Sequence, residues 1–350
     1  MALSAARGPE LPGWVPFRVD WRTSPPVVHW CQLGRRRFEE PFFEQTVGAA
    51  LRDPATLLLQ HRTPIDVLSD FAPPRFGPEP SGFVFHLSRC GSTLVTQMLA
   101  ALSRNVVLSE ATPIDALLRA GRVVPGLGEE RQTAWLRGMV GALGRTRNEG
   151  ESRLFVKLDS WHVRALPLLR RAFPDVPWIF LYREPVEVLV SHRRQRGAQT
   201  MPGALTPETL GLDLASAVAM EPDEYAAHLL ESLCRAAREG LALGGGLLVH
   251  YRELPDAVAD TVAAHFGVTW SEPERARMAE AAARDAKDPA RAFAGDRDSK
   301  QREATDALRA LAERIVGPVY RELETLRCAQ PSGGRATRPG RRTDPAPGAG

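Results

Sequence analysis

Residues 84–99 read VFHLSRCGSTLVTQML, in which an apolar segment is followed by a small polar turn and then by an apolar pattern of helical spacing. Such a turn between a strand and a helix presents the free backbone amides of the first helical turn, which attract anions. The nucleotide-triphosphatase pattern G-x-x-x-x-G-K-[ST] is absent, because an arginine stands where a lysine is usual. The segment therefore predicts an anion site, but not a standard site for ATP.

Strand-like and helix-like segments alternate after residue 81, and this alternation predicts an α/β domain. The short apolar runs fit a mostly parallel sheet that is buried on both faces, within a three-layer α/β/α arrangement. Ligands of such folds bind at the carboxyl ends of the strands. The expected strands are 83–87, 105–108, 153–157, 177–182 and 247–251.

Helices are expected where apolar residues recur every three or four positions. Residues 135–143 and 258–266 show such a face, and Ser271 with Glu274 forms a capping box before another helix. The spacing of apolar residues over 308–319 predicts one long final amphipathic helix.

Three regions are expected from the changes in composition along the 350 residues. Residues 1–80 are rich in Pro, Trp and Phe, and form an N-terminal extension of unknown role with one helix near 40–52. Residues 71–82 read as a proline-stiffened linker, and 81–328 form the main domain. Residues 329–350 contain four arginines and almost nothing to bury, which predicts a disordered tail.

Charge and cysteine usage exclude several classes of protein. The net charge of +3 is too small to indicate nucleic-acid binding. No apolar segment is long enough for a signal peptide core or a membrane span, and the histidines lack metal-ligand spacing. The cysteines are far apart, which argues against a disulfide framework or a zinc site: Cys31, Cys90, Cys234 and Cys328. We expect a soluble cytoplasmic protein without a metal or a membrane partner.

Two further strand ends carry cationic side chains. Lys157 ends one expected strand, Arg183 follows another, and Ser191 comes eight residues later in a helix. Carboxyl ends of parallel strands share one edge, so these residues should lie beside the turn at 88–93. A guanidinium can bind a phosphate through two hydrogen bonds, and a hydroxyl can complete the site. The alternatives are a surface ion pair of Arg183 with Glu184 or Glu187, and a solvent-facing Ser191.

Taken together, the segments LSRCGSTL, VVLSEATP, FVKLDSW and FPDVPWIFLYREPVEVLVSH resemble the sulfotransferases that use 3′-phosphoadenosine 5′-phosphosulfate (PAPS). The style is that of the bacterial and protein-tyrosine type, whose loop begins R-[SC]-G-[ST]-T, and the likeness covers about residues 81–325. It implies a P-loop NTPase-like sulfotransferase fold. It also implies transfer of a sulfuryl group from PAPS, as co-substrate, to a hydroxyl or amine acceptor.

The resemblance implies a role for each matching residue. Arg183 and Ser191 would hold the 3′-phosphate, Lys157 would lie near the transferring sulfuryl group, and Glu110 would be the catalytic base. The 5′-phosphosulfate would be wrapped by Arg89, Cys90, Gly91, Ser92, Thr93 and Leu94, with the Arg89 charge also assisting catalysis.

Some assignments stay open from the sequence. Asp159, which could instead cap a helix, and His162, which could simply pack, are alternative bases. In the segment 293–301, Ser299 and Lys300 would either close over the nucleotide or lie in a solvated loop. Tyr251 is interpreted as a structural residue. Competing functions are a nucleoside-triphosphate-dependent kinase and a non-catalytic nucleotide-binding protein. The acceptor, a small molecule or a peptide, and the oligomeric state are not readable.

Overall fold

The computed structural model describes residues 13–202, 213–286 and 295–330. Its centre is a five-stranded parallel sheet with the order β5-β6-β4-β7-β8. Nearly every residue in these strands is buried, as expected for a sheet covered on both faces. The strands are β4 (Pro80–His86), β5 (Asn105–Ser109), β6 (Arg153–Lys157), β7 (Trp178–Tyr182) and β8 (Gly246–His250).

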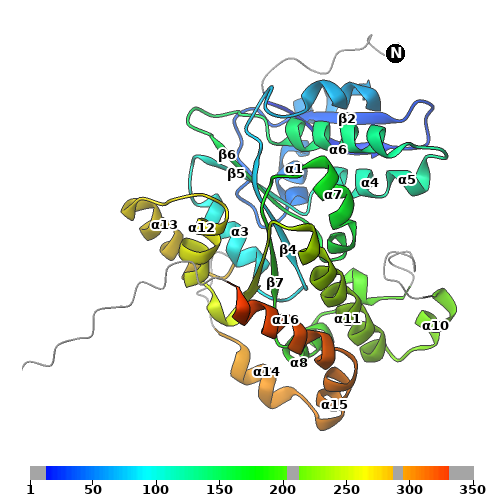
Figure 1. Ribbon diagram of the computed structural model, residues 1–350. Helices are drawn as coiled ribbons and strands as arrows, with labels where there is room; N and C mark the ends of the chain where they lie inside the picture. Colours follow the sequence, from blue (N-terminus) through cyan, green and yellow to red (C-terminus); the bar gives the residue numbers. More distant parts are fainter. Residues whose placement is uncertain (1–12, 203–212, 287–294, 331–350) are drawn as a thin grey trace, which may run out of the picture.

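Helices cover both faces of this sheet (Figure 1). Those on one face are α3 (Ser92–Ala100), α12 (Ala263–His265) and α13 (Glu272–Ala282), which follows the predicted capping box. Those on the other are α6 (Glu129–Leu143), α7 (Leu166–Ala172) and α11 (Pro222–Gly240). Within this sheet the chain enters at β4 in the middle and continues to β5 at one edge. It then runs through β6 and β7 to β8 at the opposite edge. The three-layer α/β/α prediction is confirmed.

The remaining helical segments have ten residues or fewer, with the exception of the last helix. The prediction of a single long final helix is wrong, because the chain forms two helices that meet at Val316. Pro318 lacks an amide hydrogen, so it fits the first turn of a new helix and not the interior of a continuous one. These segments are α4 (Thr112–Leu118), α5 (Ala120–Val123), α8 (Pro185–Arg194), α10 (Leu214–Ala219), α14 (Arg297–Glu303), α15 (Asp306–Ile315), α16 (Gly317–Ala329), 3₁₀ turns at Ser160–Ala165, Ala198–Thr200, Leu241–Leu243 and Tyr251–Glu253, and a π-helical turn at Val258–Val262.

The N-terminal region forms a second, antiparallel sheet, which the sequence did not predict. Its order is β1-β2-β3, and its apolar side chains belong to the same buried cluster as those of the central sheet. α6 lies directly on this region, since a Cβ at Gly138 would come within 1.8 Å of the Leu68 carbonyl oxygen. The elements are β1 (Trp14–Asp20), β2 (Val27–Gln32), α1 (Phe43–Leu51), α2 (Pro54–Leu58), β3 (His61–Pro64) and a 3₁₀ helix (Ile65–Phe71).

The ends of the predicted regions are placed as follows. The expected linker, 71–82, starts at the last residue of the 3₁₀ helix and ends inside β4. Of the predicted tail, residues 331–350 lie outside the described residues. All four cysteines are free thiols. Within the described part of the chain, every helix is too short or too polar to cross a lipid bilayer.

Candidate functional site

The loop between β4 and α3 is built on unusual backbone angles. Ser88, Arg89 and Gly91 have φ values of +78°, +52° and +84°, a region that side chains disfavour. A Cβ at Gly91 would also lie 3.0 Å from the ring of Tyr251. The loop therefore requires glycine at this position, and it leads directly into the first turn of α3, whose leading amides have no partners within the helix.

Side chains of the loop anchor it to the neighbouring elements. The Arg89 guanidinium donates to the backbone carbonyl of Gln195 at 2.7 Å, just beyond α8. The buried thiol of Cys90 donates to the carbonyl of Leu181 in β7 at 3.2 Å. The Cys90 thiol therefore helps to hold the loop in position against β7.

Lys157 and Glu110 form an ion pair where β5 and β6 end. The Lys157 ammonium, which is only 1% exposed, lies 2.7 Å from Glu110 Oε1 and 5.1 Å from the centre of the Phe42 ring. His86 Nε2 lies 3.3 Å from the same Glu110 oxygen, while its Nδ1 accepts the Ser88 amide at 3.1 Å. Burial alone would raise the pKa of Glu110, but Lys157 and His86 together hold it well below its usual range.

Arg183 follows β7 and is buried against an aromatic ring. Its guanidinium carbon stacks 3.9 Å from the centre of the Tyr251 ring, on the residue that also borders Gly91. Its Nε donates to Glu187 at 2.6 Å, and an Nη donates to Asp296 at 2.8 Å. The predicted alternative pair with Glu187 is therefore present, but it is buried and not on the surface. Ser191, one turn further along α8, donates to the Glu187 carbonyl at 2.8 Å.

One cavity of about 510 Å³ joins these groups at the carboxyl edge of the parallel sheet. All the residues that the sequence predicted for the site line it, although their roles stay predictions. They are Arg89, Cys90, Gly91, Ser92, Thr93, Leu94, Glu110, Lys157, Arg183 and Ser191. The cavity thus has one cationic end at Lys157 and another at Arg183, with the glycine turn beside both.

Comparison with protein-family models identifies the family of this chain. Residues 80–272 match the model of the sulfotransferase family, which is more than half of the chain. The chain belongs to the sulfotransferase family. No curated protein sequence matches it.

Solved sulfotransferase structures resemble the chain at low identity. One from Alicyclobacillus acidocaldarius is 16% identical with a TM-score of 0.43, covering 72% of this chain and 97% of that one. A second, from Mycobacterium avium, is 14% identical with a TM-score of 0.42, covering 80% of this chain and 81% of that one.

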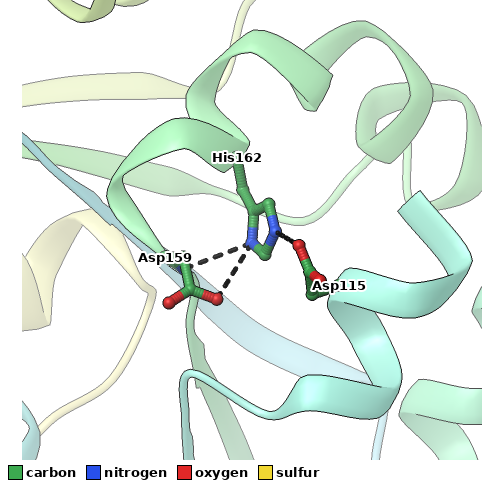
Figure 2. A group of neighbouring side chains, drawn as sticks. All are labelled: Asp115, Asp159 and His162. Atoms are coloured by element: carbon green, nitrogen blue, oxygen red, sulfur yellow. Dashed lines mark hydrogen bonds and ion pairs between the residues drawn. The ribbon is translucent and has the colours of Figure 1, made fainter. Parts of the chain in front are cut away.

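Figure 2 shows a histidine that lies between two aspartates, one of which lines this sulfotransferase cavity. His162 Nε2 is 2.8 Å from Asp115 Oδ1, and its Nδ1 accepts the amide of Asp159 at 3.2 Å. Asp159 lines the cavity, whereas His162 and Asp115 do not. Burial raises the pKa of Asp159 to about 7, with the charges of Glu110 and Asp115 adding to the effect against that of His162.

The same three side chains offer oxygen and nitrogen atoms within 4.8 Å of one another, close enough to hold a metal ion. Two of the three groups are already engaged, because both His162 nitrogens have partners and Asp115 also accepts from the Trp161 indole at 3.2 Å and pairs with Arg119. We therefore interpret the cluster as a hydrogen-bonded support for the cavity wall.

The structure adds cavity residues that the sequence did not assign. Phe42 comes from the N-terminal region, before the part that matches the family model, and no motif pointed to it. Trp161 lies in the FVKLDSW segment, whose motif residues did not point to it. Tyr251, interpreted as structural, and Lys300 both line the cavity, whereas Ser299 donates to the Asp296 carbonyl at 2.9 Å.

Proposed function

We propose that this sulfotransferase moves a sulfuryl group from PAPS to a hydroxyl or amine acceptor. The supporting observation is that one cavity holds two separate cationic ends with a glycine turn between them. A nucleotide that carries both a 5′-phosphosulfate and a 3′-phosphate offers an anion to each end. The loop from Arg89 to Leu94 and Lys157 would hold the first, and Arg183 with Ser191 the second.

The reaction is an in-line displacement at sulfur. The bond from sulfur to the phosphate oxygen breaks while the bond from sulfur to the acceptor oxygen or nitrogen forms, and charge builds on the leaving phosphate. The loop amides, Arg89 and Lys157 would stabilise that charge. Removal of one such donor typically lowers the rate roughly 100–1000-fold. The products are the sulfated acceptor and the 3′,5′-bisphosphate.

The acceptor proton goes to Glu110 in this proposal. Its carboxylate is fixed beside Lys157 and ionised at neutral pH, since Lys157 and His86 outweigh the effect of burial on its pKa. Asp159, which also lines the cavity, is the alternative base. His162 has no direct access to the acceptor, because it lies behind Asp159 and outside the cavity lining.

The acceptor side of the cavity includes two aromatic residues. Phe42 stands over the Lys157 ammonium, and Trp161 is held by its bond to Asp115. These rings give an apolar surface next to the expected transfer point, which suits an acceptor whose hydroxyl is attached to an apolar body. Both a small molecule and a peptide side chain meet this description.

Calorimetric titration tests the nucleotide. We expect micromolar binding of adenosine 3′,5′-bisphosphate and no binding of ATP, the reverse of what a kinase would give. Incubation with labelled PAPS and a panel of phenols, alcohols, amines and tyrosine peptides then separates an enzyme from a binding protein. Because Arg89 and Lys157 supply fixed positive charge, we expect transfer to persist in a metal chelator. Binding of ATP in preference to the bisphosphate would contradict the proposal.

A further inference from the structure

Asp296 lies between the two buried cations at the Arg183 end of the cavity. One carboxylate oxygen accepts from the Arg183 guanidinium at 2.8 Å, and the other is 2.6 Å from the Lys300 ammonium. Arg183 and Lys300 are both almost fully buried, and all three residues line the cavity. A carboxylate therefore bridges the two cations in the way that two oxygens of one phosphate would.

Two carboxylates that are not equivalent pair with the cations at this end. Glu187 is 3% exposed and is fixed by Arg183 Nε at 2.6 Å and by the Gln301 amide at 2.8 Å. The Asp296 side chain is 39% exposed and precedes α14. Although burial acts to raise the pKa of Asp296, the hydrogen bonds from Lys300 and Arg183 lower it, so it is ionised at neutral pH.

The balance of charge decides what can bind here. Arg297 adds a third positive charge, because its Nε lies 3.6 Å from Glu187 Oε1. While Asp296 keeps its place, it occupies donors of both Arg183 and Lys300 and offsets one positive charge, so it competes with a phosphate, whose charge at neutral pH is about −2. If Asp296 turns outward, the remaining groups carry a net positive charge and both cations regain free donors. Glu187 cannot leave in the same way, because its carboxylate is buried and held on two sides.

We propose that Asp296 is a specificity-determining counter-ion that the 3′-phosphate displaces from Arg183 and Lys300, and that this exchange sets the affinity for the nucleotide. The inference rests on the proposed function, because it assigns the 3′-phosphate to this end of the cavity. It predicts that Asp296 competes with the phosphate, so that removal of its charge strengthens binding.

The test compares two ligands and two variants by calorimetry with the full chain. Adenosine 3′,5′-bisphosphate carries the 3′-phosphate, and adenosine 5′-monophosphate lacks it. Asp296→Asn removes the competing charge at nearly constant shape. Asp298→Asn is the matched control, since it makes the same chemical change two residues away, at an exposed side chain outside the cavity lining. Thermal unfolding of both variants confirms that the fold is kept.

We expect Asp296→Asn to tighten bisphosphate binding by roughly tenfold or more, the effect of a competing charged hydrogen bond, with monophosphate binding unchanged. Asp298→Asn should leave both affinities within about twofold, as for a surface substitution. If the wild-type chain prefers the bisphosphate but Asp296→Asn binds it equally or more weakly, or tightens on both ligands alike, the inference is overturned and the proposed function stands. If neither wild type nor Asp296→Asn prefers the bisphosphate, the assigned nucleotide is wrong and the inference falls with it.

Discussion

Replacement of Glu110 by glutamine tests whether the Glu110 carboxylate is the catalytic base. The Glu110 carboxylate lies 2.7 Å from the Lys157 ammonium and 3.3 Å from His86 Nε2. Glutamine keeps an oxygen that can accept from Lys157, but it cannot take the acceptor proton. We expect kcat/KM for sulfuryl transfer to fall roughly 100–10,000-fold. Binding of the bisphosphate should change little, because Arg183 and the glycine turn are untouched.

The pH profile separates Glu110 from Asp159. The pKa of Glu110 lies well below its usual range, as Lys157 and His86 outweigh burial, so Glu110 is deprotonated throughout the neutral range. With Glu110 as base, kcat/KM of the wild-type chain should be flat between about pH 6 and 8. Burial raises the pKa of Asp159 to about 7. With Asp159 as base, the rate would instead fall about tenfold for each pH unit below 7.

Asp159→Asn is the matched control, because it neutralises the other carboxylate of the same cavity. A profile that falls steeply below pH 7 in the wild type, together with an Asp159→Asn variant that is inactive and a Glu110→Gln variant that is active, would refute the reasoning. Stability must be followed in parallel. Removing the Glu110 charge leaves Lys157 buried, at a cost of at most about 3 kcal/mol, the lower end for a broken buried pair.

Three further changes have defined outcomes. Gly91→Ala should weaken bisphosphate binding about tenfold in calorimetry, because φ is +84° and the new Cβ would lie 3.0 Å from Tyr251, and a left-handed alanine alone costs about 1–2 kcal/mol. Phe42→Ala should raise the acceptor KM about 5- to 30-fold with bisphosphate affinity unchanged, which corresponds to a loss of about 1–2 kcal/mol of apolar burial against the acceptor. An unchanged KM would remove Phe42 from the acceptor site. Burial lowers the pKa of His250 to about 4, so the folded state does not take the proton that the unfolded chain binds below about pH 6.5. The free energy of unfolding should therefore decrease as the pH falls from about 6.5 to 4, and denaturant unfolding of His250→Gln should show a decline shallower by up to about 1.4 kcal/mol per pH unit.

The central sheet could be predicted because its strands are short, apolar and bounded by polar turns. The five expected strands agree with β4 to β8 to within a few residues at each end. Parallel pairing then brings their carboxyl ends to one edge, which is why the loop at 88–93, Lys157 and Arg183 meet although they are distant in the sequence. The apolar segments locate the strands, and the parallel topology then locates the site at their carboxyl ends.

The N-terminal sheet could not be predicted in the same way. β1 contains Pro16, where its pairing with β2 shifts register, and β3 is four residues long and mostly polar. Neither strand has the alternation that a half-buried strand usually shows. The site contacts that were missed depend on packing over long distances in the chain. Asp296 is 113 residues from Arg183, and Phe42 reaches Lys157 from outside the region that carries the motifs.

In the proposed mechanism, the two ends of the cavity use the same kind of ion pair for different purposes. A buried cation without a partner is costly, so Lys157, Arg183 and Lys300 each need a carboxylate. At the transfer end the partner is fixed, because the Glu110 amide donates to the Lys157 carbonyl at 2.9 Å and its φ is +55°. At the other end the partner, Asp296, is half-exposed and precedes a short helix. A fixed carboxylate keeps the reacting groups in register throughout the transfer, whereas an exchangeable one allows the incoming anion to replace it. If the proposed exchange holds, selectivity for a nucleotide with a 3′-phosphate follows from the difference between a displaced monoanion and an incoming dianion, and not from the number of cations alone.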